Sequence, residues 1–114
     1  MGQQARLLRK RHAWTGELIV RADEAITLAF RVLIAVGKTD WTPRIVQFTD
    51  KPKRMGLTCY EERRIDLNYL YLDDDREMRE TVCHEGAHAI TQGDGHGYAF
   101  AAACAHVEKV MATL

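Results

Sequence analysis

The chain has 114 residues, a length that suits one domain. Hydrophobic residues make up 46% of it and charged residues 28%, which is typical of a globular protein and excludes a disordered tail or a collagen-like fibre. Sixteen basic residues balance sixteen acidic ones. Net charge therefore gives no general attraction to nucleic acid or acidic lipid, and any such contact has to come from a local patch.

The cysteines and the apolar segments indicate the compartment. The three cysteines are Cys59, Cys83 and Cys104. An odd set without a CxxC pair is not a disulfide framework and suits a reducing compartment. No apolar segment typical of a signal peptide precedes Gly16. The most apolar stretch, residues 26–36, contains Arg31 and is too short to cross a bilayer. We therefore expect a cytoplasmic protein with no membrane partner.

The first third of the chain predicts one long helix near the N-terminus. Residues 1–14 are polar and basic, and we expect a flexible segment that frays or extends this helix. Thr15 is the predicted N-cap, and Gly37 is the predicted end. Apolar residues between them recur at three- and four-residue steps, which predicts one buried stripe. Its members are Leu18, Ile19, Ala22, Ile26, Ala29, Phe30, Leu33 and Ile34.

The middle of the chain predicts three short strands. Residues 44–49, 55–60 and 64–68 are rich in strand-forming side chains. Turns are predicted over residues 50–53 and 61–63. This spacing predicts a small three-stranded antiparallel sheet. One strand, with residues 64–68 as the candidate, is expected to be an edge that accepts an extended peptide.

Two further helices complete a predicted α+β fold. Asp74 and Glu77 resemble a capping box, which predicts a helix over residues 76–92 that stops at Gly93. A last, alanine-rich helix is predicted over residues 98–113. Its apolar face consists of Phe100, Cys104, Val107 and Met111.

The central motif is HExxH, formed by His84, Glu85, Gly86, Ala87 and His88 on the predicted helix. Histidines at positions i and i+4 of a helix are neighbours, with Cβ atoms about 5–6 Å apart, so both imidazoles can reach one ion. Zinc prefers nitrogen ligands, and a catalytic zinc site has three protein ligands. Glu85 can take a proton from the attacking water and deliver it to the leaving amine. The alternative is a helix with two surface histidines.

A third ligand is needed, and His96 is the first candidate. It follows His88 by eight residues, and glycines between the two allow the chain to fold back. Asp94 is closer and chemically possible. Cys104 and His106 would lie about 12 and 15 Å further along the last helix than His96, which is too far to bind the same ion. The spacing differs from the metzincin pattern, in which the third histidine follows the second after six residues.

The paired motifs resemble those of the SprT-like metalloproteases. HExxH at residues 84–88 is followed by His96-Gly-Tyr-Ala-Phe100, which is similar to the HGxxF or HGxxW of that family. The order of elements is also similar, and the resemblance covers residues 18–110. It implies a zincin-like single domain, here residues 15–114, and a zinc-dependent endopeptidase.

The resemblance also implies roles for individual residues. His84, His88 and His96 would hold one catalytic Zn²⁺, and Glu85 would be the general base. Spartan, the eukaryotic branch of the family, cleaves proteins crosslinked to DNA. The chain looks like a minimal catalytic core of this family. A protein or peptide substrate is therefore expected, and DNA-bound or DNA-crosslinked proteins are candidates.

Basic residues beside aromatic ones are candidates for contact with single-stranded DNA. They are Lys51, Lys53, Arg54, Arg63 and Arg64. Phosphate contacts and base stacking would hold the DNA strand.

Tyr60 and Tyr98 are candidate donors to the oxyanion of the tetrahedral intermediate. The simpler interpretations are that the basic residues lie in solvated turns and that the tyrosines are packing residues.

Two alternative functions share the same motif. One is a regulatory peptidase of a phage or mobile element that acts without DNA. The other is a non-catalytic zinc-binding interaction module, in which the metal ties two helices together. The glutamate in the base position argues against the second, because a structural zinc site has no use for that carboxylate.

Overall fold

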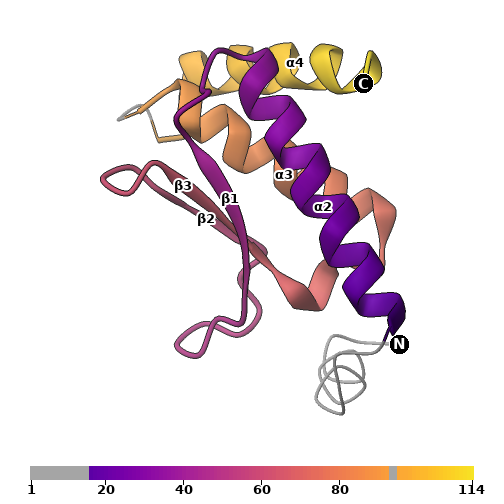
Figure 1. Cartoon of the computed structure of the whole chain (residues 1–114). Helices are drawn as coiled ribbons and strands as arrows, with labels where there is room; N and C mark the ends of the chain where they lie inside the picture. Colours follow the sequence, from indigo (N-terminus) through magenta and orange to yellow (C-terminus); the bar gives the residue numbers. More distant parts are fainter. Residues whose placement is uncertain (1–15, 93–94) are drawn as a thin grey trace.

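Along the described part of the chain, a long helix is followed by three short strands and two further α-helices (Figure 1). The computed structural model describes residues 16–92 and 95–114. The predicted basic segment over residues 1–14, the predicted cap Thr15 and the alternative ligand Asp94 lie outside these ranges. The described residues form one small α+β domain.

Helix α2 (Gly16–Ala35) is the first helix of the described residues, and it begins at Gly16 and not at the N-terminus of the chain. It ends as predicted, because Gly37 has a φ of +83°, which glycine adopts without a steric penalty. The Gly37 N–H donates to the Ile34 carbonyl and the Lys38 N–H to the Leu33 carbonyl. These two bonds form a Schellman motif and satisfy carbonyls at the helix end.

The buried face of α2 is rotated from the predicted stripe. Among residues 21–36 the fully buried side chains are Ala25, Ala29, Val32 and Leu33. Phe30 and Ile34, predicted to be core residues, are 39% and 58% exposed. The prediction was wrong for these two because the helix has apolar residues on more than one face, so periodicity alone does not select the buried one.

The sheet is mixed, not the predicted antiparallel meander. Strand β3 (Arg64–Asn68) lies between β1 (Thr42–Val46) and β2 (Gly56–Cys59). It pairs with β1 in parallel and with β2 antiparallel. The physical reason is the long connection over residues 47–55, which lets β2 pass to the far side and leaves room for β3 in the middle.

The strand order also corrects the predicted edge. Residues 64–68 form the central strand, so they are hydrogen-bonded on both sides and cannot accept a peptide. The outer strands of the described sheet are β1 and β2. Any β-augmentation therefore has to use one of these two.

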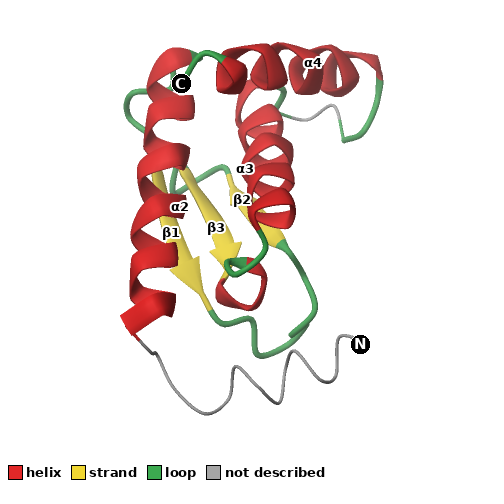
Figure 2. Ribbon diagram, turned by 90° about the vertical axis from the view of Figure 1, so that its right-hand side faces the viewer, coloured by secondary structure: helices red, strands yellow, loops and turns green. Residues whose placement is uncertain are grey.

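Helices α2 and α3 lie on one face of the sheet (Figure 2). Helix α2 packs on β1, while α3 (Asp75–Ile90) packs on β2 and β3. Helix α4 (Tyr98–Ala112) crosses the ends of α2 and α3. The core between these layers includes Ile65, Leu67, Val82, Cys83 and Val107. No helix in the described ranges is long and apolar enough to cross a membrane.

Candidate metal centre

Helix α3 carries the HExxH motif and has a defined start. Its N-cap is Asp74, whose carboxylate accepts a hydrogen bond from the Glu77 N–H at 3.0 Å, as the sequence predicted. A short 3₁₀ helix, Tyr69–Tyr71, leads from β3 to this cap. The cap and the packing of Met78 and Val82 in the core fix the position of α3 over the sheet.

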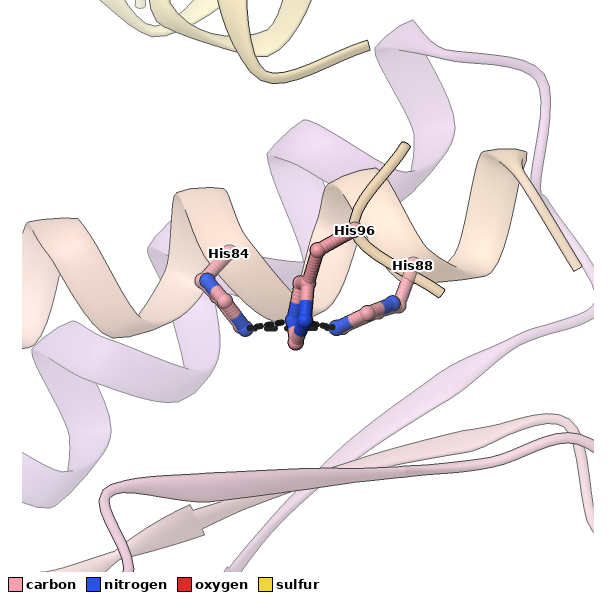
Figure 3. Close-up of side chains that lie close together, drawn as sticks. All are labelled: His84, His88 and His96. Carbon is pink, nitrogen blue, oxygen red and sulfur yellow. Dashed lines mark hydrogen bonds between the residues drawn. The ribbon is translucent and has the colours of Figure 1, made fainter. Parts of the chain in front are cut away.

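The segment between α3 and α4 returns His96 to the motif. Gly95 has a φ of +61°, a conformation that favours glycine, and Gly97 is the N-cap of α4. This turn brings the imidazole of His96 beside those of His84 and His88 (Figure 3). The three residues form the only group of three potential metal ligands found in residues 16–92 and 95–114.

The three imidazoles converge through their Nε2 atoms. The distances are 3.2 Å from His84 to His88, 3.2 Å from His88 to His96 and 3.4 Å from His84 to His96. Ligands placed tetrahedrally at the zinc–nitrogen distance of 2.0–2.1 Å lie about 3.3–3.4 Å from one another. The triangle therefore has the dimensions of one face of a tetrahedral zinc site.

Hydrogen bonds among the imidazoles do not explain this triangle. Each neutral imidazole has one donor and one acceptor nitrogen, and three Nε2 atoms cannot all satisfy one another at once. Burial lowers the pKa of His84 and of His88, and the neighbouring imidazoles lower both further. The pocket therefore favours neutral rings, which is the form that binds a metal ion.

Phe100 supports the three rings from α4. Its ring centroid lies 5.0 Å from that of His84, 4.4 Å from that of His88 and 4.9 Å from that of His96. Phe100 is itself buried at the packed interface of α3 and α4. One aromatic side chain therefore limits the rotation of all three imidazoles, which preorganises the site.

Glu85 points from α3 towards the sheet and is 5% exposed. Its Oε1 accepts a hydrogen bond from the Thr58 hydroxyl at 2.8 Å. Burial raises the pKa of the Glu85 carboxyl to about 7, although the Thr58 hydrogen bond and the Arg54 charge oppose that shift. A carboxylate with such a pKa can both accept and release a proton near neutral pH.

A cleft of about 300 Å³ opens beside His84. It is lined by Met55, Gly56, Glu80, Thr81, His84 and Glu85. The general-base candidate and one ligand candidate therefore face the same space. That space is bordered by β2, one of the two outer strands of the described sheet.

The two candidate oxyanion donors lie in different surroundings. Tyr60 follows β2, packs edge-on against Trp41, and has a pKa raised by burial and by the charge of Glu85. Tyr98 is the first residue of α4 and is 96% exposed. Tyr60 is thus linked electrostatically to the Glu85 carboxylate.

The five candidate DNA contacts divide into two groups. Arg63 pairs with Asp40, and Arg64 pairs with the buried Asp66 at 2.7 Å. Lys51 and Lys53 are exposed, and neither has an ion-pair partner among the described residues. The guanidinium of Arg54 lies 5.6 Å from the centre of the Phe48 ring.

Sequence reasoning missed two residues of β2 that contact Glu85. Thr58 donates to its carboxylate, and a Cβ added at Gly56 would lie 2.9 Å from its Oε2. No local signal in the sequence links β2 to residue 85, because the contact between them depends on how α3 packs on the sheet.

Together, the α+β fold and the three-histidine cluster define a protein with a candidate metal centre beside a buried carboxylate. The profile of the SprT-like family matches residues 21–114. The chain belongs to the SprT-like family, which is linked to metalloprotease activity. Searches among curated proteins and solved structures give no match.

Proposed function

We propose that this chain is a zinc-dependent endopeptidase with a zincin-like domain. One observation carries the proposal: three imidazole Nε2 atoms form a triangle of 3.2–3.4 Å beside the buried carboxylate of Glu85. His84, His88 and His96 would hold the ion. Membership in the SprT-like family supports the same reaction class.

The chemistry divides between the ion and the chain. Zinc, when bound, supplies a Lewis acid that polarises the peptide carbonyl and lowers the pKa of water. The Glu85 carboxylate takes a proton from the attacking water as the new C–O bond forms. It then gives this proton to the amide nitrogen as the C–N bond breaks, so the same carboxyl serves as base and as acid.

Tyr60 and Tyr98 remain the candidates for stabilising the oxyanion. The position of Tyr60 favours it, because its hydroxyl is close enough to Glu85 to be affected by that charge. Replacing each tyrosine with phenylalanine removes one hydroxyl and keeps the ring. Loss of an oxyanion donor lowers kcat about 10²–10³-fold, so the variant with that loss identifies the donor.

The substrate is proposed to lie in extended form beside β2. This strand borders the cleft through Gly56, and it has one strand neighbour in the described sheet, β3. Backbone hydrogen bonds to an edge strand bind a peptide without requiring a particular sequence. These hydrogen bonds would place the scissile bond of the substrate in the space between the side chains of His84 and Glu85.

DNA-bound or DNA-crosslinked proteins are the proposed substrates. Supporting this, Lys51 and Lys53 are exposed and unpaired among the described residues, on a loop fixed by other contacts. Arg54, on the same loop, stacks on Phe48. A rigid basic loop can contact phosphates. Arg63 and Arg64 already have acidic partners, so we expect them to contribute less.

The test compares zinc-loaded wild type with the Glu85→Gln variant. Each is incubated with a basic DNA-binding protein, with and without single-stranded DNA, and fragments are followed by mass spectrometry. Zinc content is measured on the same samples. We expect equal zinc, cleavage by the wild type and none by the variant, since an amide cannot accept the proton.

The DNA arms of this experiment separate the alternatives. Cleavage only with DNA supports action on DNA-bound proteins, and cleavage equal without DNA favours a regulatory peptidase. Equal cleavage by both proteins contradicts the role of Glu85. Stoichiometric zinc with no cleavage in any arm, and a melting temperature that falls on chelation, indicates a non-catalytic module.

A further inference from the structure

The carboxylate of Glu85 is held by a neighbouring strand and not by its own helix. Thr58 lies on β2, and its Oγ1 is 2.8 Å from Oε1 of Glu85. The same hydroxyl lies 3.3 Å from the Glu85 backbone carbonyl, so it has two acceptors on one residue. The shorter contact, to the carboxylate, is the stronger one when Glu85 is ionised.

Gly56 completes the surface on which this carboxylate rests. Residues two apart in a strand face the same side, so Gly56 and Thr58 both point towards α3. A Cβ at Gly56 would lie 2.9 Å from both Cγ and Oε2 of Glu85. The missing side chain at residue 56 thus leaves the space that the carboxylate occupies, and the hydroxyl at residue 58 fixes its orientation.

The two oxygens of the carboxylate therefore differ in their surroundings. Oε1 accepts the Thr58 hydrogen bond, whereas no described residue donates to Oε2. Both belong to a side chain that lines the cleft with His84. A fixed Oε1 leaves Oε2 as the oxygen that can exchange a proton with a bound substrate or water.

We propose that Thr58 is the positioning residue for Glu85, and that its hydroxyl directs Oε2 to the reacting atoms. The proposal rests on the proposed endopeptidase function. Thr58 is not one of the three candidate metal ligands, and it acts through the Glu85 carboxylate, to which it donates a hydrogen bond. The hydrogen bond limits the rotation of a carboxylate whose usefulness as a base depends on its position.

The test uses two variants and one control. Thr58→Val keeps the shape and strand preference of the residue but removes the hydroxyl, and Thr58→Ser restores a hydroxyl. Thr42→Val is the control, because Thr42 is an exposed threonine on β1. Crystal structures of the metal-free variants show the orientation of Glu85 without any need for activity, and cleavage kinetics follow on the zinc-loaded proteins.

We expect the Glu85 carboxylate to leave its position in Thr58→Val and to keep it in Thr58→Ser. Since a misplacement of about 1 Å can cost 10²-fold in rate, kcat should fall about 10- to 100-fold in Thr58→Val. KM and zinc content should stay at the wild-type values, and Thr58→Ser should recover most of kcat. Thr42→Val should match the wild type.

Two results would overturn the proposal. The first is a Glu85 carboxylate that has not moved in the Thr58→Val crystal structure. The second is a kcat of Thr58→Val within about twofold of wild type, because a twofold change corresponds to a negligible change in the activation barrier. If the Thr58→Val protein does not fold, the crystal structure of Thr58→Ser is the test instead. The proposal then requires that the serine hydroxyl of this variant retains the hydrogen bond to Glu85. If wild type and Glu85→Gln cleave equally, the role of Glu85 as the general base in the proposed function fails, while the structures still show whether Thr58 positions the Glu85 carboxylate.

Discussion

Two glycines near the site should respond in opposite ways to the same substitution. A methyl group at Gly56 would lie 2.9 Å from the backbone oxygen of Asp66 and from two atoms of Glu85. Contacts between atoms of this kind normally exceed 3.4 Å, so the separation between the added methyl group and its neighbours has to increase by about 0.5 Å. The carbonyl of Asp66 belongs to the central strand and cannot move without disturbing the sheet. Glu85 therefore has to move, and the short contact with the Asp66 carbonyl strains the pairing of β2 with β3.

The Gly86→Ala substitution adds the same methyl group in a site with room for it. That Cβ would lie 3.4 Å from Cγ1 of Val32 and 3.8 Å from Cγ1 of Val107, both ordinary contacts. Glycine inside a helix costs about 1 kcal/mol relative to alanine. We expect Gly86→Ala to raise the free energy of unfolding by up to about 1 kcal/mol, which raises Tm by about 4–8 °C for a domain of this size.

For Gly56→Ala the overpacking should dominate, with a loss of about 1–3 kcal/mol. Thermal unfolding followed by circular dichroism on metal-loaded protein measures both shifts. Cleavage should fall in Gly56→Ala because Glu85 is displaced, while zinc content stays unchanged. A Gly56→Ala protein as stable and as active as wild type would refute this account of the contact between β2 and α3.

Three further changes test other parts of the structure. Asp74→Ala removes the N-cap of α3 and should lower the free energy of unfolding by about 1 kcal/mol, measured by urea denaturation. Asn68→Ala removes a buried amide that donates to the Pro52 and Arg54 carbonyls at 2.8 and 2.6 Å; it should cost about 1–3 kcal/mol and accelerate hydrogen exchange of the loop over residues 52–54, and exchange at the wild-type rate would contradict this. Removing zinc with a chelator should lower Tm, and zinc at about 100 times its Kd should restore about 2.7 kcal/mol; a Tm that ignores zinc would contradict the metal site.

The sequence predicted α3, α4 and the histidine cluster because their signals are local. The Asp74 cap, the i, i+4 spacing of His84 and His88, and the glycines before His96 all act within a short stretch of chain. Helix periodicity and turn chemistry describe such stretches well. The predicted bounds of α3, 76–92, differ from Asp75–Ile90 by one or two residues at each end.

The strand order could not be predicted from the same kind of signal. Strand β3 was placed correctly along the chain, at residues 64–68, but its partners depend on where β1 and β2 lie in space. A short turn predicts a hairpin for β2 and β3, and that hairpin is present. The parallel pairing of β1 with β3 needs a long connection, which leaves no mark in a strand's own sequence.

The surroundings of Glu85 are non-local for the same reason. Thr58 precedes Glu85 by 27 residues, and only the packing of α3 on β2 brings them together. The rotation of α2, which buries Val32 and exposes Ile34, was also decided by neighbouring elements and not by the helix alone.

X-ray absorption at the zinc edge, on wild type and on His96→Ala, tests the central claim most directly. The account predicts one zinc per chain in the wild type, with three imidazole nitrogens at about 2.0–2.1 Å. His96→Ala should lose one nitrogen ligand and bind zinc more weakly, since His96 completes the triangle. Zinc bound through sulfur, or a wild-type spectrum unchanged in His96→Ala, would contradict the three-histidine site.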